Sequence, residues 1–264
     1  MQFKDSTALI TGASEGIGRA TALRLSAMGC HVIAAARSVP RLESLREEIA
    51  AGGNGSCEIL PLDLMRPADA LRILEELCQR TAVDVGIVNA GMGQYGPFAA
   101  SPWEDVEPLL RLNIDGALLT VRALLPGMRK RRRGSIVMLS STLGKRAVPY
   151  NAAYCASKYA LHGFSDALRL ELRPENIHVG VVCPARTDTA FFNRMTYSVP
   201  QGQSRRVPTS SPDRVADAVI RCIRRRRREV VVSPEGALFA FVGSHFPRLT
   251  DTLLYHSVPR PTEE

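Results

Sequence analysis

The chain has 264 residues, of which 45% are hydrophobic and 23% charged, a composition that excludes a disordered chain, a collagen-like rod and a coiled coil. Its length suits one α/β domain, and we expect residues 1–264 to fold as a single unit. Lys and Arg number 34 against 26 acidic residues, and the net charge of +8 favours anionic partners such as phosphates, nucleic acid or an acidic membrane surface.

Seven short runs of apolar or β-branched residues predict strands. Their near-continuous hydrophobicity indicates strands that are buried on both faces, as in a parallel sheet. Helix-length segments lie between them, so the sequence predicts an α/β fold with one doubly wound parallel sheet of about seven strands and helices on both faces. The runs are Ala8 to Ile10, His31 to Ala36, Cys57 to Leu62, Val83 to Val88, Ser135 to Leu139, Ile177 to Cys183 and Glu229 to Ser233.

Several helix boundaries are also marked. Ser38 and Pro40 predict the start of a helix that Gly52 and Gly53 end. Ser101, Pro102 and Glu104 have the spacing of a capping box, which predicts a long helix from there to about Arg131.

Two prolines, Pro108 and Pro126, fall inside that long helix and are expected to bend or interrupt it. The irregular stretch at about 185–212 is too long for an ordinary connection and is predicted to be a substrate lid.

Most of the excess positive charge sits in two basic runs: Lys130 to Arg133 and Arg224 to Arg228. Each follows a helix-like segment, and cations are favoured at helix C-termini. Neither run contains the aromatic residues expected of a nucleic-acid surface, so we expect solvated helix ends and no nucleic-acid partner.

The six cysteines show no C-x-x-C pair and no metal-type spacing with histidine, so the sequence predicts neither a disulfide framework nor a metal site. Residues 1–6 lack the apolar region of a signal peptide, and no stretch approaches the roughly 18 apolar residues of a membrane span. We expect a cytoplasmic protein. The apolar C-terminal segment at about 237–256 leaves open whether it serves a pocket, a subunit contact or a membrane surface.

A glycine-rich turn follows the first predicted strand: Thr11-Gly12-Ala13-Ser14-Glu15-Gly16-Ile17-Gly18. Glycines there allow a tight turn and let a diphosphate approach the backbone N–H groups at a helix N-terminus. The spacing G-x-x-x-G-x-G predicts a nucleotide site, although such a turn also occurs for packing alone.

A second group of residues has the character of an acid/base site. Tyr154 and Lys158 are four residues apart in a helical stretch, which places them on one face. A nearby ammonium is expected to lower the tyrosine pKa toward the range of a general acid or base. Ser141, just after the fifth strand, is placed to donate a hydrogen bond to a carbonyl oxygen beside Tyr154. By itself, such a Tyr-Lys pair is more often a core aromatic residue with an exposed cation.

Taken together, these residues resemble the short-chain dehydrogenase/reductase family from about Thr7 to Ser233. Four motifs agree in order and spacing: Thr11 to Gly18, Asn89-Ala90-Gly91, Asn113, and Ser141 with Tyr154 and Lys158. The resemblance implies a Rossmann-type sheet of seven strands, a nicotinamide dinucleotide, and hydride transfer between its ring and a carbonyl or alcohol carbon.

The resemblance also implies the residue roles. Tyr154 would exchange the proton, Lys158 would lower its pKa and hold the nicotinamide ribose, Ser141 would polarise the substrate oxygen, and Asn113 would help fix Lys158 and a water. Tyr154 and Lys158 thus also contact the cofactor. The other implied cofactor residues follow strands or lie in the glycine turn: Gly12, Ser14, Glu15, Gly16, Ile17, Gly18, Arg37, Asp63, Leu64, Asn89, Ala90, Gly91, Pro184, Thr187 and Thr189.

The end of the second strand indicates whether the cofactor carries a 2′-phosphate. That strand ends Ala34-Ala35-Ala36-Arg37, without the acidic residue that accompanies NAD. Arg37 offers a charged fork to a 2′-phosphate, which predicts NADP(H) over NAD(H). Glu15 argues the other way, since many NADP-preferring relatives carry a basic residue in the glycine turn.

The sequence departs from the family at Ala185 and Arg186, where the family usually has a glycine after Pro184. The expected substrate wall is mostly apolar, which suits a hydrophobic substrate with one reactive oxygen, although these side chains also suit a core. Its candidates are Met92, Tyr95, Phe98, Leu143, Pro149, Phe191 and Phe192.

We therefore expect an NADP-dependent oxidoreductase that reduces a hydrophobic ketone or aldehyde, or oxidises a secondary alcohol. The alternative is a non-catalytic NADP(H)-binding regulatory or nucleic-acid-binding protein on the same fold. Family resemblance also implies a homodimer or homotetramer. Leu161, Phe164 and Leu168 offer an apolar stripe for that contact, or for the subunit's own core.

Overall fold

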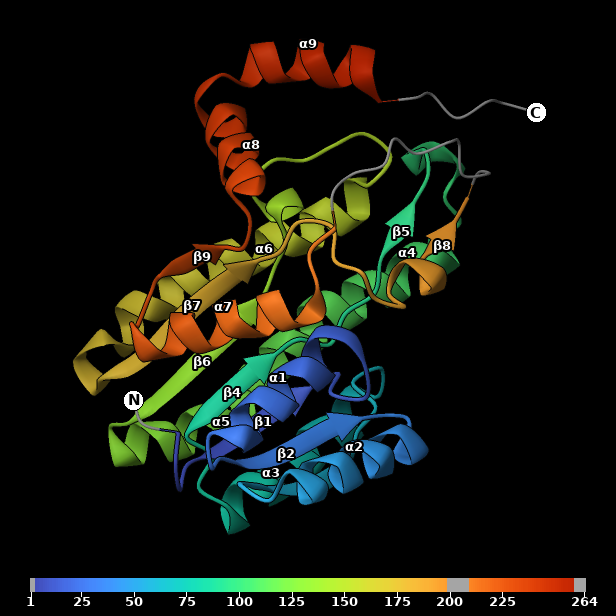
Figure 1. Ribbon diagram of the computed structural model, residues 1–264. Helices are drawn as coiled ribbons and strands as arrows, with labels where there is room; N and C mark the ends of the chain where they lie inside the picture. Colours follow the sequence, from blue (N-terminus) through green and yellow to red (C-terminus); the bar gives the residue numbers. More distant parts are fainter. Residues whose placement is uncertain (1–2, 199–208, 259–264) are drawn as a thin grey trace.

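The computed structural model describes residues 3–198 and 209–258 and contains a central sheet of seven parallel strands (Figure 1). The strand order is β3-β2-β1-β4-β6-β7-β9. The bounds are β1 (Thr7–Thr11), β2 (His31–Ala36), β3 (Ser56–Pro61), β4 (Val85–Val88), β6 (Gly134–Leu139), β7 (Ile177–Cys183) and β9 (Glu229–Val231). All pairings between these neighbours are parallel, as the buried apolar runs predicted.

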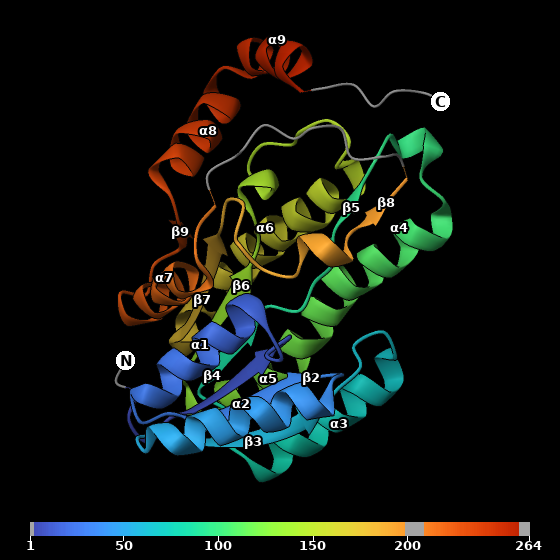
Figure 2. The same ribbon diagram turned by 45° about the vertical axis from the view of Figure 1, so that its right-hand side comes forward.

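Helices cover both faces of this sheet (Figure 2). On one face, buried side chains of α1, α2 and α7 pack against the strands, and on the other those of α3, α5 and α6 do so. The doubly wound fold is confirmed. The helices are α1 (Gly16–Ala27), α2 (Val39–Gly52), α3 (Pro67–Arg80), α4 (Trp103–Leu110), α5 (Gly116–Arg131), α6 (Ala152–Leu172), α7 (Pro212–Arg224), α8 (Pro234–His245) and α9 (Pro247–Ser257).

The direction of strand order reverses between β1 and β4, which are hydrogen-bonded neighbours at the centre of the sheet. Such a switch point leaves a crevice beyond the carboxyl ends of the strands, because the connections on either side run away from each other. The glycine turn after β1 and the Asn89 segment after β4 meet at this point.

The predicted strands agree with the observed ones to within two residues at each end. The last strand stops at Val231, two residues before its predicted end, because Ser233 caps the next helix. Its Oγ accepts a hydrogen bond from the Gly236 N–H at 3.0 Å, which is an N-cap interaction.

The predicted capping box at Ser101 and Glu104 is wrong. The helix begins at Trp103 after Pro102, and the Ser101 hydroxyl instead donates to the carbonyl of Pro97 at 2.9 Å. That hydroxyl also accepts from the side chain of Gln94, so it belongs to the loop before the helix.

We expected Pro108 and Pro126 to bend or interrupt the long helix, but the irregular turn lies at neither proline. Pro108 lies within α4 and Pro126 within α5, and the change of geometry is a π-helical turn at Arg111–Asp115 between them. Pro126 and the residue whose carbonyl it frees, Arg122, are both exposed, so water can satisfy that carbonyl.

The apolar stripe of α6 serves the subunit's own core. Leu161 and Leu168 are buried in the cluster beneath α3, α5 and α6, and Phe164 packs against it. By contrast, Leu170 on the same helix is 69% exposed. These residues therefore give no support to a subunit contact through this stripe.

The contrast between buried and exposed leucines predicts their effects on stability. Leu45 of α2 has no exposed surface, so Leu45→Ala is expected to lower the free energy of unfolding by about 2 to 5 kcal/mol. Leu170→Ala, at the exposed position on α6, is the matched control and should change it by less than about 0.5 kcal/mol. Urea unfolding followed by circular dichroism measures both, and equal effects would contradict the assigned burial.

Candidate active site

The glycine turn joins β1 to α1 through two left-handed backbone conformations, Gly12 with φ +66° and Gly16 with φ +54°. Gly18 has a different reason to be glycine. A Cβ atom placed on it would lie 2.2 Å from the carbonyl oxygen of Gly12. The turn is therefore closely packed against the start of α1. The first N–H groups of a helix that begins in this way can bind a diphosphate.

Asn89 at the end of β4 holds this turn in place. Its Nδ2 donates to the carbonyls of Thr11 at 3.0 Å and Gly12 at 3.1 Å. The backbone N–H groups of Asn89 and Ala90 in turn donate to Thr11 Oγ1. The two sides of the switch point are thus cross-linked, and Thr11 is a contributor that the sequence analysis did not single out.

Three other predicted cofactor residues follow β2 and β3. Arg37 is exposed at the first position after β2. After β3, the Asp63 carboxylate accepts from the Met65 N–H at 3.0 Å and forms a local turn. The neighbouring Leu64 is buried against Gly116.

Ser141, Tyr154 and Lys158 come together as the spacing predicted. Ser141 follows β6, and its Oγ accepts from the Leu143 N–H at 3.1 Å. Lys158 is buried, donates to the carbonyl of Leu139 at 3.0 Å, and has its Nζ 5.7 Å from the centroid of the Tyr154 ring. Burial of the ammonium and its tie to β6 fix its position relative to Tyr154.

The direction of the Tyr154 pKa differs from the prediction. Burial raises the pKa of Tyr154 to about 12, and the hydrogen bond with Ser141 only partly opposes that rise. Burial also lowers the pKa of Lys158 to about 8. Loss of hydration outweighs the attraction that was expected to lower the tyrosine pKa, because both groups are removed from water together.

Asn113 lies in the π-helical turn, a feature with no sequence signal beyond the two nearby prolines. Its side chain accepts from the Met92 N–H and donates to the Met92 carbonyl, both at 2.9 Å, and donates to Ser157 Oγ at 3.0 Å. These partners differ from the expected direct support of Lys158. Gly91 lies between the two, since a Cβ there would be 3.0 Å from Asn113 Oδ1 and 3.5 Å from Lys158 Nζ.

The first part of the predicted lid, which follows β7, packs over these residues, whereas residues 199–208 lie outside the described part of the chain. Phe191 places its ring 6.0 Å from that of Tyr154, and Thr189 faces Gly16 of the glycine turn. A two-stranded parallel sheet of β5 (Gln94–Tyr95) and β8 (Thr196–Tyr197) joins the lid to the segment after β4.

The residues that depart from the family pattern fit locally. Pro184 accepts from the Thr142 N–H through its carbonyl at 2.9 Å, and the hydroxyl of Thr187 donates to the carbonyl of Ala185 at 3.1 Å. The Arg186 guanidinium lies 4.5 Å above the Phe192 ring. Its charge is therefore held by an aromatic face at the root of the lid.

The residues expected to form the substrate wall differ in their burial and in their contacts. Met92 packs in a small cluster with Tyr154, and Leu143 is partly buried near Ser141. Tyr95 pairs with Tyr150 and Tyr197, at centroid distances of 5.9 and 6.2 Å. Phe98 is 58% exposed.

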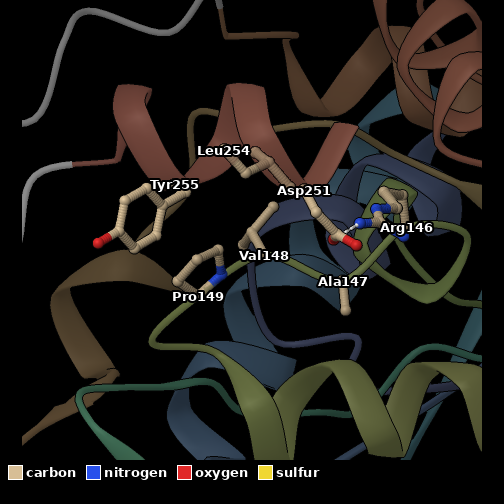
Figure 3. A pocket seen from close by; sticks show the side chains of 7 residues that line it. All are labelled: Arg146, Ala147, Val148, Pro149, Asp251, Leu254 and Tyr255. Atoms are coloured by element: carbon tan, nitrogen blue, oxygen red, sulfur yellow. Dashed lines mark hydrogen bonds and ion pairs between the residues drawn. The ribbon is translucent and has the colours of Figure 1, made fainter. Parts of the chain in front are cut away.

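Pro149 lines a cavity of about 420 Å³ against α9 (Figure 3). There Leu254 and Tyr255 face Val148 and Pro149, and Arg146 is ion-paired with Asp251. The two C-terminal helices lie together away from the sheet (Figures 1 and 2) and leave large apolar side chains more than half exposed. These are Leu238, Phe241, Phe246, Leu249, Leu253 and Tyr255.

Glu15 is paired with two arginines that the sequence did not single out. Arg41 of α2 contacts its carboxylate at 2.7 Å, and Arg194 of the lid contacts it at 2.6 Å. The acidic charge in the glycine turn is thereby balanced by cations from both sides.

The basic runs Lys130 to Arg133 and Arg224 to Arg228 are exposed and directly precede β6 and β9. They therefore lie at the amino edge of the sheet, opposite the site. Among the described residues no helix is both long enough and apolar enough to span a membrane.

Comparison with known proteins now adds to this geometry. The model of the short chain dehydrogenase family matches residues 6–198. The chain belongs to the short-chain dehydrogenase/reductase family. As a member, it is an oxidoreductase that acts between alcohol and carbonyl groups and has a nicotinamide dinucleotide site.

Among relatives, a dehydrogenase/reductase SDR family protein 7-like of Drosophila melanogaster is 33% identical over 255 residues, covering 92% of this chain and 77% of that protein. A 3-ketodihydrosphingosine reductase of Bacteroides thetaiotaomicron is 36% identical over 197 residues, covering 74% and 69%. The solved short-chain dehydrogenase of Sphingobium yanoikuyae in complex with NADPH is 28% identical, with a TM-score of 0.81 and 98% coverage of both chains.

The lowered pKa of Lys158 predicts a dependence of stability on pH. Between about pH 8 and 10.5 the unfolded chain binds a proton at this lysine that the folded protein does not, so the free energy of unfolding rises with pH. Lys158→Met removes this dependence. From pH 7 to 9.5 the free energy of unfolding of the parent should therefore rise relative to the variant by about 2 kcal/mol.

Urea unfolding of both proteins across this range measures the difference, and the titration of all other groups largely cancels. If the difference in free energy of unfolding between the two proteins stays constant with pH, the lowered pKa of Lys158 is wrong.

Proposed function

We propose that this short-chain dehydrogenase/reductase reduces a hydrophobic ketone or aldehyde with NADPH, and oxidises the corresponding secondary alcohol in reverse. The observation that carries the proposal is the Tyr154 side chain, whose hydroxyl interacts with Ser141, with the buried Lys158 Nζ 5.7 Å and the Phe191 ring 6.0 Å from its ring centroid. One proton donor, one hydrogen-bond donor and one cation thus converge where a carbonyl oxygen would bind.

The proposed roles follow from these positions. The bound nicotinamide supplies the hydride. Tyr154 donates the proton to the carbonyl oxygen, and Ser141 donates a hydrogen bond to the same oxygen as charge develops on it. Because the pKa of Tyr154 is raised to about 12, its hydroxyl stays protonated at neutral pH, which suits a proton donor to a carbonyl oxygen.

Lys158 and Asn113 act on either side of Gly91. Lys158 is proposed to bind the ribose hydroxyls of the cofactor, for which its fixed ammonium is suited. Asn113 is proposed as a positioning residue, because its hydrogen bonds fix Met92 on the substrate side and Ser157 on the helix that carries Tyr154 and Lys158.

The N-terminus of α1 offers the backbone N–H groups that a diphosphate needs. The close packing of Gly18 on the Gly12 carbonyl keeps the turn tight beside them, which supports a dinucleotide at this place. Gly12, Ser14, Gly16 and Ile17 would line it, with Asn89 to Gly91, Asp63 and Leu64 beyond, and Pro184, Thr187 and Thr189 on the lid side.

NADPH is favoured by charge. The position after β2 carries Arg37 and no carboxylate, and the opposing charge of Glu15 is already paired with Arg41 and Arg194. The Sphingobium yanoikuyae relative, whose structure holds NADPH, supports the same choice.

The substrate class is supported by the side chains around Tyr154. Met92 and Phe191 present apolar surface beside the Tyr154 side chain, and Tyr95, in the segment that follows β4, pairs with Tyr150. The Bacteroides thetaiotaomicron relative is named a 3-ketodihydrosphingosine reductase, which supports a ketone substrate here.

Removal of the proton donor is the direct test of catalysis. Tyr154→Phe should fold and bind NADPH as the parent does, with turnover lower by at least about 100-fold, the low end of the effect of a general acid. Turnover is followed by nicotinamide absorbance with a panel of ketones, and binding by cofactor fluorescence. Tyr159→Phe, on the exposed side of α6, is the control and should leave turnover near that of the parent. Near-parental turnover of Tyr154→Phe would reject the role of Tyr154.

The cofactor preference is tested at Arg37. Loss of a charge-assisted contact worth about 1.5 to 3 kcal/mol should shift the ratio of kcat/KM for NADPH over NADH by roughly 10- to 100-fold toward NADH in Arg37→Asp. Arg221→Asp, exposed on α7, is the charge-matched control and should keep the parental ratio. An unchanged ratio in Arg37→Asp would place recognition of the 2′-phosphate elsewhere.

A further inference from the structure

Three side chains from distant parts of the sequence meet behind Lys158. His162 lies one helical turn after Lys158 on α6, Cys183 is the last residue of β7, and Glu229 is the first residue of β9. One potential ligand atom from each lies within 4.8 Å of the others. The cluster was invisible in the sequence because its members are separated by 21 and 46 residues, unlike the short spacings of metal motifs.

The distances suit a small tetrahedral ion. Cys183 Sγ lies 3.7 Å from His162 Nε2. In a tetrahedral zinc site with Zn–S of about 2.3 Å and Zn–N of about 2.0 to 2.1 Å, the sulfur and nitrogen are roughly 3.6 Å apart. The pair is therefore already spaced as two ligands of one ion.

The third donor lies on the open side of the cluster. Glu229 Oε2 is 3.6 Å from His162 Nδ1, the ring nitrogen on the other side from Nε2, and 2.8 Å from Lys145 Nζ. One ion binds only one ring nitrogen, so the Glu229 carboxylate must turn toward Nε2 to share an ion with Cys183. The His162 side chain is 16% exposed, and those of Glu229 and Lys145 are 27% and 30% exposed. Glu229 and Lys145 are therefore partly open to solvent, whereas Cys183 is buried.

We propose that His162, Cys183 and Glu229 bind Zn²⁺, with a water molecule as the fourth ligand. Thiolate, imidazole and carboxylate form a set that zinc prefers, and three protein ligands leave one position open. On binding, the Cys183 thiol releases its proton to solvent and the Lys145 ammonium gives up Glu229. The charge of the ion is then balanced by the thiolate and the carboxylate.

The protonation states are compatible with this exchange. Burial lowers the pKa of His162, so its ring is neutral and available as a ligand near neutral pH. Burial raises the pKa of the Cys183 thiol, so the ion must displace a proton there. The other facing charges are Asp166 and Arg169 on α6, together with Lys158 behind Cys183.

Occupation of the site would join α6, β7 and β9 close to the proposed catalytic lysine. An ion that binds the folded chain and not the unfolded one stabilises it by mass action. The proposal concerns this site alone and stands whether or not the reductase assignment above is correct.

The test uses the full chain, treated with a chelator and then titrated with Co²⁺, which reports a thiolate ligand by a charge-transfer absorption. We expect this band to saturate at one equivalent and to disappear on addition of Zn²⁺. Cys183→Ala should abolish the band. Cys222→Ala is the matched control, a second fully buried cysteine on α7, and should retain it.

His162→Gln provides a second variant in case Cys183→Ala does not fold, which circular dichroism determines. One equivalent of Zn²⁺ should raise the Tm of the parent and of Cys222→Ala, and leave that of His162→Gln unchanged. Absence of the thiolate band in the folded parent, or its persistence in Cys183→Ala, would overturn the proposal and leave the cluster as an ion pair beside a core thiol.

Discussion

The close approach of Gly18 to the Gly12 carbonyl, held by Asn89, is the contact on which the rest of the site depends. It fixes the end of β1 against the end of β4 at the one place where the strand order reverses. The N-terminus of α1 then opens onto the crevice, and the segments after β4, β6 and β7 are brought to its rim. A side chain at Gly18 would force apart the turn and Asn89, and with them the two halves of the sheet's carboxyl edge.

A second constraint is the burial of Tyr154 and Lys158 on the same face of α6. Their environment disfavours both charged forms, so the pair rests as a neutral phenol beside an ammonium whose pKa is lowered. The carbonyl of Leu139 and the hydroxyl of Ser141 give each group one polar partner. Asn113 in the π-helical turn adds a further support, because its side chain contacts both Met92 and Ser157.

The sequence predicted those features that depend on residues close together in the chain. Seven apolar runs gave the sheet, Gly53 ended α2 as expected, and the spacing of Ser141, Tyr154 and Lys158 placed them together. The features it missed depend on competition between partners. The Ser101 hydroxyl bonds to the loop carbonyl of Pro97 and does not cap the helix. Pro126 lies at an exposed position, where the carbonyl that it leaves without a partner faces solvent. Burial raises the pKa of Tyr154, which the nearby Lys158 was expected to lower. The partners of Glu15, and the meeting of His162 with Cys183 and Glu229, require the three-dimensional fold, because nothing near them in sequence marks them.

The segment after β7 is connected to the glycine turn by charge and to the segment after β4 by backbone pairing. Arg194 contacts Glu15 at the start of α1, while β8 pairs with β5 and Phe191 lies against Tyr154. Because Arg41 shares the same carboxylate, a phosphate that attracted Arg41 would leave Glu15 to Arg194 alone. Glu15 thus links Arg41, on the helix that follows Arg37, to the segment whose Phe191 lies against Tyr154.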